Sequence, residues 1–85
     1  MITAQEILTD STNEDLLQRY LSLTANQREQ EFLSTSRAAK RIGVSVRTIQ
    51  LWIEGGKIKA ILIGGKYKVH LGSLLAYIKS RLDGQ

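Results

Sequence analysis

The sequence predicts a small, mostly α-helical fold with one β-hairpin, and three observations lead to this prediction. The chain has 85 residues, which is enough for one small domain and little more. Two short amphipathic segments flank Gly43, and two short segments with β-branched and aromatic residues flank Gly64-Gly65. Hydrophobic residues make up 42% of the chain, so it has enough apolar side chains for a small core.

The composition excludes several classes of protein. The chain has no cysteine, which excludes a disulfide scaffold, a thiolate metal site and a cysteine nucleophile. No apolar run approaches the roughly 20 residues that a membrane span requires. Residues 1–6 have neither the basic nor the apolar region of a signal peptide. We therefore expect a cytoplasmic protein without a bound cofactor.

Charge divides the chain into two parts. Residues 1–33 carry six acidic and two basic side chains, a net charge of −4, whereas residues 34–85 carry two acidic and ten basic side chains, a net charge of +8. The boundary near Phe32-Leu33 predicts an acidic N-terminal arm over residues 1–32 and a basic domain over residues 33–85. A small domain with this positive charge is suited to a nucleic-acid partner.

The acidic arm is predicted to contain an amphipathic helix. Ser11 or Thr12 has the capping-box spacing to Glu14 or Asp15. Apolar residues then fall on one broad helical stripe, which consists of Leu16, Leu17, Tyr20, Leu21 and Leu23. Two interpretations of this stripe are open: it packs on the basic domain of its own chain, or it forms a dimer or partner-protein interface.

Two other segments of the arm are less regular. Residues 25–31 are polar, and they either continue the helix or form a linker. Residues 1–10 are expected to be weakly ordered, apart from a short turn near Ile7-Leu8.

The basic domain opens with two short helices joined by a tight turn. Ser34 is the predicted N-cap of a first helix that runs to Ile42, and Gly43 ends it because glycine readily takes the left-handed conformation after a helix. Ser45 caps a second helix over Val46–Glu54. Two helices joined at a glycine in this way form a helix-turn-helix pattern.

The second helix has two distinct faces. Ile49, Trp52 and Ile53 share one face at helical spacing and are predicted to lie in the core. The opposite face carries Arg47, Gln50, Leu51 and Glu54, with Thr48 at its edge.

Residues 57–70 are predicted to form a hairpin that turns at Gly64-Gly65. We expect a three-residue loop, Gly64-Gly65-Lys66, because it places Ile61 opposite Val69 and makes one face of the hairpin wholly apolar. Lys66 then lies at the tip. A final helix over about residues 72–81 supplies further apolar side chains to the core.

Several short segments occur in an order that is found in a known protein family. The matching segments are Leu33-Ser34, Ala38-Ala39, Ile42-Gly43-Val44-Ser45, Arg47-Thr48-Ile49, Trp52-Ile53, Gly56-Lys57-Ile58 and Ile63-Gly64-Gly65-Lys66-Tyr67-Lys68-Val69. Over about residues 33–80 the chain resembles the excisionase-type, MerR-like winged helix-turn-helix DNA-binding family.

The resemblance implies a fold and a function. The second helix would enter the major groove of double-stranded DNA, and the hairpin would be a wing on the backbone or the minor groove. The protein would be a sequence-specific transcriptional regulator or an excisionase, that is, a recombination directionality factor. The resemblance does not extend to the acidic arm.

The expected DNA contacts lie on the second helix and the hairpin. They are Ser45, Arg47, Thr48, Gln50, Leu51, Lys57, Lys66 and Lys68. Arg47 would reach a phosphate or a guanine edge, and the lysines would reach phosphates. Three interpretations of Leu51 are open: it packs under the wing, it contacts a thymine methyl group, or it contacts a partner protein.

Other residues favour ordinary structural roles. Trp52 and Tyr67 are expected in the core rather than as stacking platforms for single strands. His70 is the single histidine of the chain, so we expect no metal site. The basic domain has no paired catalytic groups, so we expect a protein that is not an enzyme.

The expected partners are double-stranded DNA, a second copy of the chain in a homodimer or cooperative oligomer on DNA, and a partner protein at the N-terminal helix. The alternative function is a protein–protein interaction module that uses the winged helix and the N-terminal helix.

Overall fold

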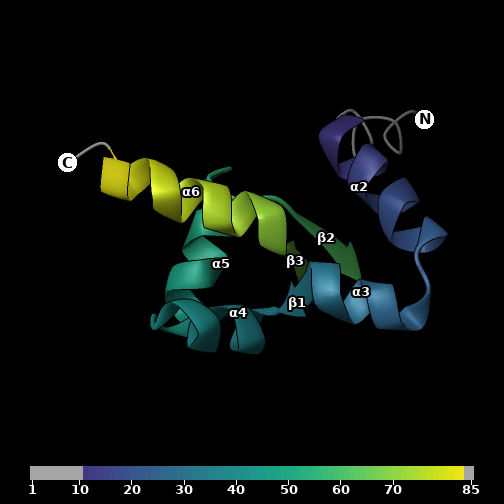
Figure 1. The fold of residues 1–85 in the computed structure, drawn as a ribbon, viewed down its shortest axis with the longest axis horizontal. Helices are drawn as coiled ribbons and strands as arrows, with labels where there is room; N and C mark the ends of the chain where they lie inside the picture. The colour runs from purple at the N-terminus through teal and green to yellow at the C-terminus, as the bar shows by residue number, and fades with distance from the viewer. Residues whose placement is uncertain (1–10, 84–85) are drawn as a thin grey trace.

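The computed structural model describes residues 11–83, with side chains from residue 14 onward. Within these residues the chain forms five helices and one three-stranded antiparallel sheet (Figure 1). The helices are α2 (Ser11–Ser22), α3 (Ala25–Glu31), α4 (Thr35–Ile42), α5 (Val46–Glu54) and α6 (Leu71–Asp83). The strands are β1 (Phe32–Ser34), β2 (Ala60–Ile63) and β3 (Lys66–His70). This arrangement confirms the predicted winged helix-turn-helix, in which the β2–β3 hairpin is the wing.

The sheet lies between two groups of helices. Figure 1 shows α2 and α3 at one end of the molecule and α4, α5 and α6 at the other, with the strands between them. The strand order is β1-β3-β2, so β3 is central. The sequence did not predict β1, because three residues between two helices are too few to show the alternation of a strand.

The helix-turn-helix forms as its caps predict. Ser34 Oγ accepts a hydrogen bond from the backbone N–H of Arg37 at 3.1 Å, and Ser45 Oγ accepts one from the N–H of Thr48 at 3.1 Å. Gly43 has a φ of 87°, in the left-handed region that ends α4. The second helix has the predicted bounds, Val46–Glu54.

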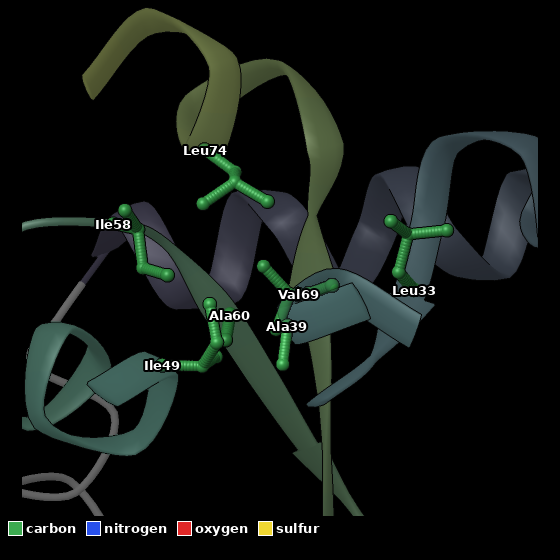
Figure 2. Packing of buried hydrophobic residues seen from close by; sticks show 8 residues of the cluster. Leu33, Ala39, Ile49, Ile58, Ala60, Val69 and Leu74 are labelled. Carbon is green, nitrogen blue, oxygen red and sulfur yellow. The ribbon is translucent and has the colours of Figure 1, made fainter. Parts of the chain in front are cut away.

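The main core joins α4, α5 and α6 to one face of the sheet (Figure 2). The side chains of Ile49, Val69 and Leu74 have no measurable exposure. Trp52 packs against this core, and its ring meets the ring of Tyr77 edge to face with centroids 5.1 Å apart. The predicted apolar face of α5 is therefore confirmed.

The hairpin loop corrects the predicted register. Ile63 pairs with Lys66 and Ile61 pairs with Lys68, so the loop has two residues rather than three. Gly64 and Gly65 have φ values of 58° and 79°, and positive φ at both central residues is the requirement of a two-residue type I′ turn. Lys66 accordingly begins β3 instead of lying in the loop.

The register prediction was wrong because it assumed that only one face of the hairpin is buried. Ile61 is only 4% exposed, although its side chain and that of Val69 lie on different faces of the sheet. Helix α2 contacts β2 and covers this second face. With both faces covered, a strand has no need to gather all its apolar residues on one of them.

The stripe of the arm divides between two environments. Leu16, Tyr20 and Leu23 are half-buried, and the ring of Tyr20 meets that of buried Phe32 edge to face at 5.2 Å. Leu17 and Leu21 remain 37% and 57% exposed. The first interpretation of the stripe, packing on its own chain, therefore holds for its inward half.

A break separates the arm into two helices. Leu23 and Thr24 lie between α2 and α3, and Thr24 forms a capping box with Gln27. Residues 25–31 are thus a separate helix. The predicted turn near Ile7-Leu8 lies outside the described residues, as do the side chains of the predicted cap at Ser11 or Thr12.

An ion-paired cluster holds the arm to the sheet. The guanidinium of Arg19 donates two hydrogen bonds to the carboxylate of Glu31, at 2.8 and 2.9 Å. Nε2 of His70 lies 3.1 Å from Oε2 of the same carboxylate. The hydrogen bond from Arg19, helped by His70, holds the pKa of Glu31 below its ordinary value.

Replacement of Ile49 by alanine is expected to lower the free energy of unfolding by about 2–5 kcal/mol, because it opens a cavity in the main core. Chemical denaturation followed by circular dichroism measures this change. Leu51→Ala is the matched control on the exposed face of α5, with an expected change of no more than about 0.5 kcal/mol. Equal losses in the two variants would contradict the orientation of α5.

Glu31→Gln is expected to lower the melting temperature at neutral pH but not in acid. The pKa of Glu31 is lower in the folded chain, so the carboxylate stabilises the fold above about pH 4.5, the ordinary value for glutamate. This stabilisation is lost as the pH falls through the lowered pKa. Thermal melts of both proteins from neutral to acidic pH should therefore converge at the acidic end. A constant difference in melting temperature would contradict the role of the ionised carboxylate.

Candidate nucleic-acid interface

The outer face of α5 is available for contacts with another molecule. Ile49 and Trp52 hold the inner face of the helix to the core. Arg47 and Leu51, one turn apart, are exposed on the outside, and Gln50 is half-buried beside them. A helix anchored on one side can present its other side to a groove without distortion.

The beginning of α5 is fixed by a local hydrogen-bond network. The hydroxyl groups of Ser45 and Thr48 lie 3.0 Å apart, and Ser45 Oγ also accepts from the N–H of Thr48. Ser45 is exposed and Thr48 is half-buried. This network sets the direction in which Arg47, in the first turn of the helix, leaves the backbone.

Leu51 does not pack under the wing. Its side chain is 48% exposed, which removes the first of its three interpretations. Leu62 on the wing is 62% exposed. Each therefore presents apolar surface to the surroundings of the protein.

The hairpin lysines occupy three different positions. Lys57 is exposed in the connection between α5 and β2, and Lys66 is exposed at the start of β3. Lys68 is half-buried in the middle of β3, opposite Ser34 of β1 and Ile61 of β2. Lys66 and Lys68 lie on the same face of the strand because side chains alternate along it.

A basic surface on α4 was missed by the sequence analysis. Arg37, Lys40 and Arg41 are exposed, whereas Ala38 and Ala39 between them are buried. The three cations recur at helical spacing i, i+3 and i+4, which is the signal that would have found them. They extend the positive surface of the helix-turn-helix beyond α5.

Within the described part of the chain, the cations of α4, α5 and the wing have no ion-pair partners. Among residues 14–83, ion pairs are present only in the cluster of Arg19, Glu31 and His70. None of the cations of α4, α5 or the wing takes part in it. A surface of this kind attracts a polyanion such as a nucleic acid, and its affinity falls with salt.

The described part of the chain shows no metal site and no membrane span, and it places the two candidate stacking residues against the core. Tyr67 and Trp52 are partly buried and pack against the core, as predicted. Residues 14–83 contain no group of three side chains able to hold a metal ion. None of the helices described is both long and apolar enough to cross a bilayer.

Comparison with known proteins gives one match. A family model described as a helix-turn-helix domain matches residues 32–82. The matched segment begins at β1 and ends in the last turn of α6, so it contains the whole core, the wing and the outer face of α5. No curated protein and no solved structure matches the chain.

Proposed function

This chain belongs to the helix-turn-helix domain family, and from this premise we propose that it binds double-stranded DNA in a sequence-specific manner. Helix α5 lies in the major groove, and the β2–β3 wing contacts the adjacent backbone or minor groove. The residues proposed for these contacts are Ser45, Arg47, Thr48, Gln50, Leu51, Lys57, Lys66 and Lys68.

One observation carries the proposal. The outer face of α5 offers a cation and an apolar side chain, Arg47 and Leu51, from a helix whose inner face is locked in the core. Arginine recognises guanine or phosphate through two parallel hydrogen bonds, and an aliphatic side chain contacts the thymine methyl group. Gln50, which directly precedes Leu51 and is half-buried, has an amide that can add a donor and an acceptor for a base edge.

The cellular role that we propose is that of a transcriptional regulator or an excisionase. The two differ in the DNA that they bind. A regulator binds at a promoter, whereas an excisionase binds repeated sites cooperatively and bends the DNA near an attachment site. Mapping the bound genomic fragments, together with a gel assay of DNA bending, distinguishes the two roles.

The second candidate function is association with a protein, and a specific observation favours it. Leu17 and Leu21 lie one turn apart on the outer side of α2, and each keeps more than a third of its surface exposed. A single winged helix reads only a short site, so self-association through this pair would lengthen the DNA sequence read by the assembly. The same surface would serve an interaction module if the chain bound no DNA.

Lys66→Gln is expected to make DNA binding less sensitive to salt without changing the preferred sequence. If Lys66 neutralises one phosphate, its loss should reduce the slope of log K against log[salt] by about 0.9. Fluorescence anisotropy with genomic fragments, measured over a range of salt concentrations, gives both the slope and the preference.

Arg47→Gln provides the contrast to Lys66→Gln, because both variants lose one positive charge. A contact to a base should change which fragment binds best as well as the affinity. An unchanged slope in Lys66→Gln would refute the phosphate contact. Absence of salt-sensitive binding by the unmodified protein at low ionic strength would favour the protein-interaction function.

Leu21→Gln is expected to abolish self-association while the chain stays folded, because Leu21 is exposed and contributes little to the core. Light scattering over a range of protein concentrations reports the molecular mass. The control is Gln18→Glu, at an exposed position of α2. Leu16→Gln would not serve, because Leu16 is half-buried and its loss would also affect stability. A concentration-independent monomer mass for the unmodified protein would contradict association through α2.

A further inference from the structure

A hollow of about 180 Å³ lies beside the wing, where neither the outer face of α5 nor the hairpin turn reaches. Its lining includes Ser34 of β1, Arg37 of α4 and Lys68 of β3, together with Arg28 and Glu29 of α3. At about 30 Å³ for each water molecule, the hollow has room for about six. It is therefore large enough for a small polar group.

The sheet register brings two of the three cations of the hollow, Arg37 and Lys68, close to each other. Ser34 lies directly opposite Lys68 in the β1–β3 pair. Arg37 follows in the first turn of α4, and its backbone N–H donates to Ser34 Oγ at 3.1 Å. Two side chains from distant parts of the sequence thus line one small space.

The charge of the hollow is not balanced by ion pairs with the residues that the structure describes. Arg37 and Lys68 form no side-chain hydrogen bond or ion pair with any of residues 14–83. Arg28 is already held by α2, because its Nε donates to the carbonyl of Tyr20 at 2.8 Å. Glu29 supplies the one negative charge of the lining, so the hollow has an excess of positive charge.

The position of the hollow favours a polyanion over an isolated acidic group. Lys66 lies two residues from Lys68 on the same face of β3, about 7 Å further toward the hairpin turn. Arg37, Lys68 and Lys66 therefore form a row of cations that leads from the hollow to the end of the wing. The phosphate groups of one DNA strand form a matching row of negative charges.

We propose that the hollow binds one phosphodiester group of the duplex, with Arg37 and Lys68 as its shared ligands. This inference rests on the proposed function and adds to it a contact made by α4, outside the recognition helix and the hairpin turn. Arg37 offers a planar fork of donors to two phosphate oxygens, and Lys68 adds a point charge. The contact carries no sequence information, but it fixes the orientation of the wing on the DNA.

The test is a double-mutant cycle on duplex binding, measured with one mixed-sequence duplex at constant salt. Arg37→Gln and Lys68→Gln are each expected to weaken binding about tenfold, the effect of losing a charge-assisted hydrogen bond. The double variant should bind little more weakly than either single variant, because the two side chains hold the same phosphate. Lys79→Gln is the control: it removes one positive charge from an exposed position of α6, outside the surface proposed to contact DNA.

Each result of this cycle has a defined meaning. Equal losses in Arg37→Gln and Lys79→Gln, or additive losses of about a hundredfold in the double variant, would overturn the shared phosphate site. Circular dichroism melts check that the variants stay folded. Duplex binding that depends on Arg47 but not on Arg37 would overturn this inference alone, whereas no duplex binding by the unmodified protein would overturn the proposed function as well.

A second arm distinguishes the duplex from free anions. Inorganic phosphate is titrated into the unmodified protein, and the Nε–H resonance of Arg37 is followed by NMR. A shift with duplex at concentrations where inorganic phosphate has no effect is expected. Saturation by inorganic phosphate with no response to duplex would assign the hollow to a free anion and overturn the DNA contact.

Discussion

The structure depends on the burial of both faces of a three-stranded sheet around its central strand, β3. Val69 of this strand is fully buried against the helix-turn-helix side, while Ile61 of the neighbouring strand is buried on the other side under α2. A two-stranded hairpin is marginally stable alone, so the wing needs the third strand and the helices on each face. Helices α2 and α3 are therefore part of the fold and not an appendage to it.

The residues that stabilise α5 are different from the residues that are proposed to contact DNA. Ile49 and Trp52 hold α5 from the inside, so Arg47 and Leu51 can face outward at no cost to the core. On the wing, the pairing of Ser34 with Lys68 ties the central strand to the start of α4. The proposed contacts of α4, α5 and the wing are thus carried by elements that the same core holds in place.

Within the described residues, the acidic and basic parts of the sequence also lie at different places in the structure. Helices α2 and α3 pack on the sheet at the end of the molecule away from α5 (Figure 1), and Glu31 of α3 is paired with Arg19 and His70. The cations of α4, α5 and the wing have no such partners among the described residues. A net charge of +4 for the whole chain thus understates the positive charge of the surface that would meet DNA.

Local signals in the sequence were sufficient for the helix-turn-helix. Serine caps, a glycine able to take positive φ and helical spacing of apolar residues act within a few positions of one another, and Ser45, Gly43 and Ile49 have the predicted roles. The register of the hairpin, strand β1 and the hollow between Arg37 and Lys68 depend on contacts between distant segments. The apolar pattern of β2 was compatible with more than one register, and only the packing of α2 on the second face shows why Ile61 can lie opposite Lys68. The sequence by itself determined the elements that obey local rules, whereas the tertiary structure decided which faces are covered and which charges meet.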